Sequence, residues 1–151
     1  MQKIMLICHA NICRSPMAEF ILREAARQRG MDGSLMISSC GTSAKAVGQP
    51  MHPSVAQTLQ KYGVPYSQTT ARQLQKSDYD QFDYFLAMDK WDLSSALRIF
   101  GSDPAHKLHL FMEWSDVPRD ITDPAYTHRF DVAFENIAEG AEALLDKLAE
   151  S

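Results

Sequence analysis

The stretch Cys8-His9-Ala10-Asn11-Ile12-Cys13-Arg14-Ser15 lies between an apolar run and a segment that begins with proline. The run Ile4-Met5-Leu6-Ile7 predicts a buried strand, and residues 16–22, Pro-Met-Ala-Glu-Phe-Ile-Leu, predict a helix with proline in its first turn. A loop that ends at a helix N-terminus points backbone N–H groups inward, and the helix macrodipole adds partial positive charge. We therefore expect residues 8–15 to form an anion-binding loop.

Two side chains of this loop indicate chemistry beyond anion binding. Helix N-termini and nearby cations lower the pKa of a cysteine thiol from about 8.5 to between roughly 3.5 and 7.5, so we expect the pKa of Cys8 to be lowered. The planar guanidinium of Arg14 is able to hold two phosphate oxygens at once. A strand followed by Cys, five residues, Arg, Ser and Pro predicts a phosphoryl-transfer site rather than an ordinary strand-to-helix connection.

Composition and charge narrow the class of protein. The chain has 151 residues, 45% of them hydrophobic and 23% charged, which is typical of one globular domain spanning residues 1–151. A net charge of −4 gives no reason to expect a nucleic acid or an anionic membrane as partner. No apolar stretch approaches the roughly 20 residues of a membrane span, and the N-terminus leads directly into a predicted strand, so we expect no cleavable signal. Three cysteines, two of them in one loop, do not form an extracellular disulfide framework, so we expect a cytoplasmic location.

Strand and helix patterns alternate along the chain. Short apolar runs predict strands at 3–7, 35–39, 84–87 and 107–110. Helical periodicity, bounded by proline, glycine or aspartate, predicts helices at 16–29, 53–62, 89–100 and 130–150, with one helical turn at 76–79. This alternation predicts an α/β fold with a parallel sheet, right-handed crossovers and helices on both faces. Ligands of such sheets bind at the carboxyl ends of the strands, which is where residues 8–15 are expected.

The segment Cys8–Pro16 resembles the signature loop of the low-molecular-weight protein tyrosine phosphatase family, and the similarity extends over nearly the whole chain. The other matching segments are Ser39-Cys40-Gly41-Thr42-Ser43, Ala71-Arg72-Gln73, 82–89 and Asp123-Pro124. The resemblance implies a single-domain, flavodoxin-like (Rossmann-like) three-layer sandwich around a four-stranded parallel sheet in the order 2-1-3-4. It also implies a hydrolase, a protein-tyrosine phosphatase that cleaves aryl phosphate monoesters through a phosphocysteine intermediate and needs no cofactor.

The resemblance assigns roles to individual residues. Cys8 is expected to be the nucleophile and Arg14 the cation that holds the phosphate oxygens. Asp123 is expected to be the general acid and then the base, ahead of its neighbours Asp116 and Asp120. The rest of the phosphate-binding loop is expected to comprise His9, Ala10, Asn11, Ile12, Cys13 and Ser15.

Several of these residues have a second interpretation. Cys13 is expected to shield Cys8 from deeper oxidation through a reversible disulfide, the alternative being a small buried apolar side chain. Ser15 is either a hydrogen-bond donor to the Cys8 sulfur or a helix cap. For Asn11 we favour a structural role, a left-handed backbone conformation, because asparagine tolerates it. His9 is expected to be exposed, and Cys40 to lie in the core.

Two positions depart from the family pattern. Many tyrosine-specific members carry an aromatic wall residue after Gly-Thr-Ser, where this chain has Lys45 between two alanines. The family's Asp-Pro is often followed by two tyrosines, whereas Ala125 precedes Tyr126 here. Lys45, Ala125 and Tyr126 are therefore the candidate substrate-wall residues, and we expect the wall around the leaving group to be thinner than in those members.

Proteins that carry phosphotyrosine are the expected partners, with phosphate and other oxyanions as inhibitors, and the chain is expected to be a monomer or a weak homodimer. The five histidines share no metal-ligand spacing, so no metal is expected. One alternative is a protein-arginine phosphatase of the same fold, although such enzymes carry Thr where Ile12 stands. An arsenate reductase would need further cysteines downstream, and none follows Cys40. A last alternative is a phosphate-binding or thiol redox-sensing module without turnover, although binding alone would need neither a thiol nor an acid.

Overall fold

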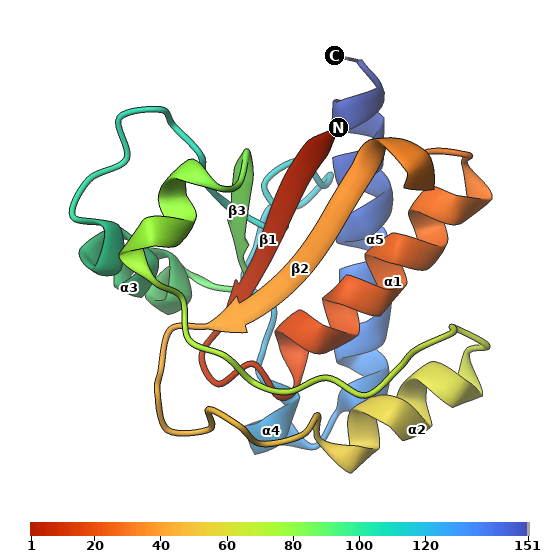
Figure 1. Cartoon of the computed structure of the whole chain (residues 1–151). Coiled ribbons are helices and arrows are strands. Elements are labelled where there is room, and N and C mark those ends of the chain that lie inside the picture. Colours follow the sequence, from red (N-terminus) through yellow and green to blue (C-terminus); the bar gives the residue numbers. More distant parts are fainter. Residues whose placement is uncertain (151) are drawn as a thin grey trace.

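The computed structural model describes residues 1–150 and contains one four-stranded parallel sheet in the order β2-β1-β3-β4. Its strands are β1 (Gln2–Cys8), β2 (Leu35–Gly41), β3 (Tyr84–Ala87) and β4 (Leu108–Leu110). Helices cover both faces of the sheet (Figure 1). The predicted α/β class, three-layer arrangement and strand order are confirmed.

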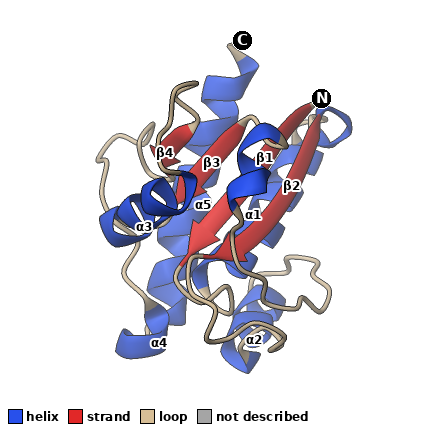
Figure 2. Cartoon of the chain, turned by 60° about the vertical axis from the view of Figure 1, so that its left-hand side comes forward, coloured by secondary structure: helices blue, strands red, loops and turns tan. Residues whose placement is uncertain are grey.

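The helices are divided between the two faces. Helices α1 (Arg14–Gln28) and α5 (Phe130–Ala149) lie side by side on one face, and α3 (Lys90–Phe100) covers the other (Figure 2). Helix α2 (Pro53–Lys61) packs against α1 and α5, while α4 (Pro124–Thr127) is one short turn ahead of α5. Short 3-10 turns occupy Asp32–Ser34 and Lys76–Asp80. None of the helices within residues 1–150 is long and apolar enough to cross a membrane.

The central position of β1 follows from its apolar side chains. Successive side chains of a strand point to opposite faces. Ile4 and Leu6 accordingly belong to the core shared with α1 and α5, while Met5 and Ile7 pack with Phe85 on the α3 side. Because β1 lies between β2 and β3, the residue that ends it, Cys8, lies in the interior of the sheet's carboxyl edge.

The predicted element boundaries agree with the structure within two residues. The strand at 84–87 matches fully, and Asp89 caps α3 as predicted by accepting a hydrogen bond from the Asp92 N–H at 2.8 Å. Strand β2 continues to Gly41, two residues beyond its prediction, while Lys107 lies outside β4. The short helix α4 and the turn Asp32–Ser34 were not predicted, because neither is long enough to show a period.

The end of β2 packs directly on the loop that follows β1. A Cβ atom at Gly41 would lie 2.7 Å from the backbone oxygen of His9, so only glycine fits at this position. The next two backbone N–H groups, of Thr42 and Ser43, donate to the oxygens of Cys8 and His9 at 3.0 and 2.9 Å. The segment 41–43 therefore packs against residues 8–9 and holds their backbone in place.

Candidate active site

The loop between β1 and α1 curls around the sulfur of Cys8. Cys8 is 3% exposed, and the backbone N–H of Asn11 donates to its Sγ at 3.3 Å. Asn11 has φ +63°, which confirms the predicted left-handed conformation. The reversal at Asn11 brings Arg14 and Ser15, the first two residues of α1, back beside the thiol.

The side chain of Asn11 fixes the loop in this shape. Its Nδ2 donates to the hydroxyl oxygens of Ser15 and Ser39 at 2.8 and 3.0 Å. Its Oδ1 accepts from the backbone N–H of Arg72 at 3.1 Å. One buried amide thus ties the loop to α1, to β2 and to the segment around residue 72, which supports the structural role expected for Asn11.

The hydroxyl of Ser15 lies against the sulfur. Its Oγ is 3.0 Å from Cys8 Sγ and 3.3 Å from the carbonyl oxygen of Cys40. Because this oxygen already accepts from Asn11, its own proton is directed to one of those two acceptors. The N-cap of α1 is Cys13, so Ser15 is not the helix cap. Donation to the sulfur during a reaction stays a prediction.

The predicted lowering of the thiol pKa is wrong in this arrangement. Burial raises the pKa of Cys8, and the charge of Asp92 adds to the rise, while Arg14 and Ser15 lower it. Desolvation outweighs the opposing effect of the cation because the sulfur is almost completely withdrawn from water. The local sequence shows the helix terminus and the arginine, but the degree of burial depends on the whole fold.

Arg14 is buried and held from two sides. Its Nη1 donates to Asp89 Oδ2 at 2.7 Å and to the carbonyl oxygen of Ile121 at 2.8 Å. Its Nη2 lies 3.3 Å from Asp92 Oδ2. Its Nε has no hydrogen-bond partner in the described part of the chain. The start of α3 and the loop after β4 therefore anchor the guanidinium at the carboxyl edge of the sheet.

Asp123 reaches the same site from the loop that follows β4. Its Oδ2 lies 3.7 Å from Arg14 Nη2, and its Oδ1 caps α4 by accepting from the Ala125 N–H at 3.0 Å. Asp120 instead accepts from the backbone N–H of Lys90. The structure thus brings Asp123, of the candidate acids in this loop, to Arg14, while its role as general acid stays a prediction.

A pocket of about 330 Å³ opens over the guanidinium. Its lining residues are His9, Arg14, Asp89, Trp91, Asp92, Asp123 and Tyr126. His9 is exposed, as expected. Tyr126 lines this pocket, whereas Lys45 and Ala125 are exposed residues outside its lining. The wall function of all three stays a prediction.

The three cysteines are free thiols. Cys13 is 3% exposed, and burial raises its pKa to about 12, with the charge of Asp123 adding to the rise. Cys40 is fully buried with Phe85 on the α3 side of the sheet, which confirms its core position. A protective disulfide between Cys8 and Cys13 stays a prediction.

Three residues at the start of α3 contribute to the site and were not predicted to do so from the sequence. Asp89 was predicted only as a helix cap, and Asp92 and Trp91 were not singled out. Their position in the sequence could have identified them, because they follow the third predicted strand and so lie at the same sheet edge as Cys8. Within residues 1–150, no group of three or more His, Cys, Asp or Glu residues is placed to hold a metal ion.

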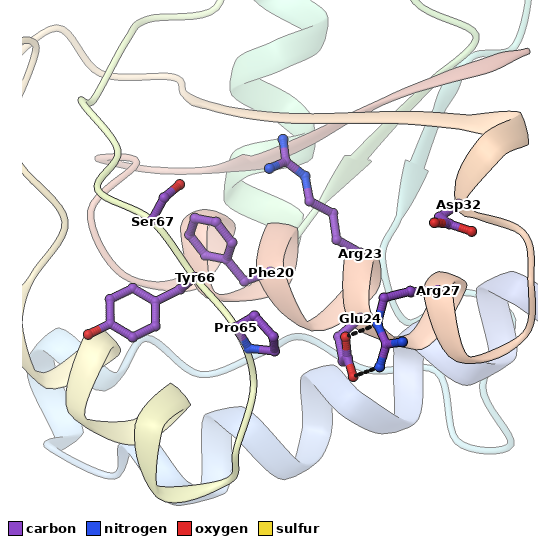
Figure 3. A pocket seen from close by; sticks show the side chains of 8 residues that line it. All are labelled: Phe20, Arg23, Glu24, Arg27, Asp32, Pro65, Tyr66 and Ser67. Carbon is purple, nitrogen blue, oxygen red and sulfur yellow. Dashed lines mark hydrogen bonds and ion pairs between the residues drawn. The ribbon is translucent and has the colours of Figure 1, made fainter.

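A second hollow of about 380 Å³ lies between α1 and the segment 65–67 (Figure 3). It is lined by Phe20, Arg23, Glu24, Arg27, Asp32, Pro65, Tyr66 and Ser67. Its cations are paired, Arg27 with Glu24 and Arg23 with Glu19, each at 2.7 Å. None of the predicted site residues lines it.

The fold and the loop together define the class: phosphatases built on a doubly wound parallel sheet, with a cysteine-containing loop after the first strand. The family described as low molecular weight phosphotyrosine protein phosphatase matches residues 3–151, and the chain belongs to this family. The family predicted from the sequence is therefore confirmed.

Named relatives agree with this assignment. The low molecular weight protein-tyrosine-phosphatase YfkJ of Bacillus subtilis (strain 168) is 35% identical over 148 residues, covering 96% of this chain and 94% of the relative. PtpA of Staphylococcus epidermidis (strain ATCC 35984), which carries the same description, is 33% identical over 144 residues, covering 95% and 91%. The crystal structure of YfkJ matches with a TM-score of 0.93 at 32% identity, covering 99% of this chain and 96% of that one. Protein-tyrosine-phosphatases are hydrolases, which is the predicted enzyme class.

Proposed function

We propose that residues 1–151 form one phosphatase domain that hydrolyses phosphotyrosine and other aryl phosphate monoesters through a phosphocysteine at Cys8. One observation carries the proposal: a carboxyl group that is distant in sequence lies beside the loop that holds the thiol and the cation. Ser15 Oγ lies 3.0 Å from Cys8 Sγ, and Asp123 Oδ2 lies 3.7 Å from Arg14 Nη2. Binding alone would require neither a nucleophile nor an acid.

In the first step the Cys8 thiol loses its proton to water, and the resulting thiolate attacks phosphorus. An S–P bond forms, the bond from phosphorus to the leaving oxygen breaks, and the Asp123 carboxyl group gives its proton to that oxygen. The loop N–H groups and Arg14 hold the three equatorial oxygens, where charge spreads in the transition state. Preorganisation supports this step, because Asn11 holds the loop in its curled shape.

In the second step Asp123 takes a proton from water, and the water oxygen attacks the phosphocysteine. The S–P bond breaks, and Cys8 departs as a thiolate. The hydroxyl of Ser15, 3.0 Å from the sulfur, donates a hydrogen bond to it and makes it a better leaving group. Inorganic phosphate is then bound by the same loop, so phosphate and similar oxyanions act as competitive inhibitors.

The remaining features follow from the same site. The substrates are proteins that carry phosphotyrosine, and the reaction needs no cofactor. We place the enzyme in the cytoplasm as a monomer or weak homodimer, without nucleic acid or membrane as partner. Its net charge of −4 supports the last point.

Turnover assays in the presence of EDTA separate this function from its alternatives. We expect hydrolysis of p-nitrophenyl phosphate and phosphotyrosine, with little activity on phosphoarginine and no reduction of arsenate by added thiols. The Cys8→Ser variant is expected to lose turnover but to keep phosphate binding, because loop N–H groups and Arg14 bind the anion. Cys40→Ala is the matched control, since it removes a buried thiol from the core and should leave turnover intact.

Two results would contradict the proposal. Substantial turnover by Cys8→Ser would exclude the covalent intermediate. A preference for phosphoarginine over phosphotyrosine would move the substrate to a phosphoguanidine, although Ile12 occupies the position where the arginine phosphatases carry Thr.

A further inference from the structure

Trp91 is a large, solvent-exposed aromatic side chain that lines the pocket over Arg14. It is the second residue of α3, is 81% exposed and lines the cavity above Arg14. The other tryptophan of the chain, Trp114, instead packs against Tyr84 and His109. An indole ring in water beside a buried guanidinium is an apolar surface directly next to the place where phosphate is expected.

The backbone around Trp91 is fixed. Asp89 Oδ1 caps the first turn of α3 at 2.8 Å, and the Lys90 N–H donates to Asp120 Oδ1 at 3.2 Å. The Ile121 N–H donates to the oxygen of Met88, the residue before the cap, at 2.8 Å. The tryptophan is therefore carried on a segment that is tied to the loop leading to Asp123.

Tyr126 lines the same pocket from another element. It lies on α4 and is 80% exposed. Its backbone N–H donates to the backbone carbonyl oxygen of Asp123 at 3.1 Å. Within the described chain, neither this ring nor that of Trp91 stacks on another aromatic ring. Lys45 and Ala125, where an aromatic wall was sought from the sequence, do not line the pocket.

We propose that Trp91, together with Tyr126, forms the aryl-binding subsite for the leaving group, and that Trp91 is the specificity-determining residue of this chain. The inference rests on the proposed function and adds the residue that selects an aromatic ester. A phenyl ring whose phosphate is held by Arg14 would cover the exposed indole. A favourable aromatic pair corresponds to about two- to tenfold in affinity beyond burial of area.

Two matched phosphonates isolate the aromatic contact without any chemical step. Benzylphosphonate and cyclohexylmethylphosphonate carry the same charge and rings of similar size, and only the first ring is aromatic. We expect Trp91→Ala to weaken the Ki of benzylphosphonate about two- to tenfold more than that of the cyclohexyl compound. Trp91→Phe should recover part of this preference. Leu97→Ala, which removes another exposed apolar side chain of α3 outside the pocket lining, should leave both values unchanged.

Fluorescence supplies a second readout. The Trp114→Phe variant leaves Trp91 as the only tryptophan, because the chain has two. Benzylphosphonate should change its emission, whereas inorganic phosphate at saturation should change it little. Binding of both ligands is measured independently by calorimetry.

The outcomes separate the two proposals. Equal weakening of both phosphonates by Trp91→Ala, or an unchanged emission with benzylphosphonate bound, overturns the subsite while the phosphatase function stands. Absence of both turnover and phosphate binding in the wild-type chain overturns the proposed function and the subsite with it.

Discussion

Replacing Asp92 by asparagine tests how charge is distributed around Arg14. The Asp92 side chain is 3% exposed, and its Oδ2, 3.3 Å from Arg14 Nη2, has no hydrogen-bond partner within residues 1–150. Burial raises the pKa of this carboxyl to about 8; Arg14 opposes the rise, while Asp89 and Asp123 add to it. We therefore expect Asp92 to hold a proton at neutral pH.

The effect on stability has a definite sign. An unfolded aspartate has a pKa of about 3.9, so between about pH 4 and pH 8 the folded chain keeps a proton that the unfolded chain has lost. The free energy of unfolding then falls by about 1.4 kcal/mol for each unit of rising pH. Asparagine has the same shape and no such proton. Between pH 5 and pH 7, the free energy of unfolding of Asp92→Asn should rise by about 3 kcal/mol relative to that of the wild-type chain, which corresponds to roughly 6–12 °C in Tm.

Urea unfolding at pH 5, 6 and 7, at constant ionic strength, measures this difference. Asp89→Asn is the companion variant. Burial by itself would raise the pKa of Asp89, but hydrogen bonds from Arg14 and from the Asp92 backbone lower it below its usual range, so the titration of Asp89 itself adds no slope over this interval. Because Asp89 helps to raise the pKa of Asp92, Asp89→Asn should flatten the stability curve as well, but less than Asp92→Asn does. Parallel stability curves for Asp92→Asn and the wild-type chain would refute the reasoning, because Asp92 would then be ionised throughout.

The pKa of the Cys8 thiol provides a second test of Asp92→Asn. Asp92 is among the groups that raise the pKa of Cys8, after burial. Asp92→Asn removes the charge of this side chain and should therefore lower the thiol pKa. The pH dependence of alkylation by iodoacetamide reports this shift, and an unmoved profile would show that the charge of Asp92 does not reach the sulfur.

Three further predictions concern the reaction and its wall. Asp123→Ala should slow phenyl and alkyl phosphates by about 10²–10⁴ and p-nitrophenyl phosphate less, whereas an equal loss for all leaving groups would make Asp123 only the cap of α4. Cys13→Ser should turn reversible peroxide inactivation of Cys8 into permanent loss, and full recovery with dithiothreitol would exclude a protective disulfide. Because Trp91 and Tyr126 line the pocket and Lys45 and Ala125 do not, Lys45→Trp and Ala125→Tyr should leave kcat/KM for small aryl phosphates unchanged, and a rise of about two- to tenfold in either variant would show that the wall positions predicted from the sequence face the ring.

The elements with a strong local pattern could be predicted from the sequence. The run at 84–87 is apolar and bounded by polar residues, and the helix after it begins with an aspartate cap, so both were located closely. Helix α4 was missed because four residues show no periodicity, even though Asp123 and Pro124 are typical of a helix start. Local signals define long elements well and single turns poorly.

The same distinction applies to the site. Cys8, Arg14 and the left-handed Asn11 could be predicted because they lie within one contiguous loop. The contacts of Arg14 with Asp92 and Ile121 could not, because they depend on how α3 and the loop after β4 are placed over the sheet edge. The prediction of a lowered thiol pKa was wrong for a related reason, since burial is a property of the assembled layers and not of the loop sequence.

The Asp92 carboxyl group is expected to affect both the stability of the fold and the affinity for anions. One guanidinium faces the carboxyl groups of Asp89, Asp92 and Asp123, and a phosphate dianion would add further negative charge beside it. With Asp92 protonated, the repulsion of that dianion is one charge smaller, and bound phosphate makes the proton harder to remove. Asparagine would keep the neutral form at every pH and relieve the cost in stability. We therefore expect aspartate at this position to make oxyanion affinity depend on pH, with the affinity falling as the pH rises through the pKa of about 8.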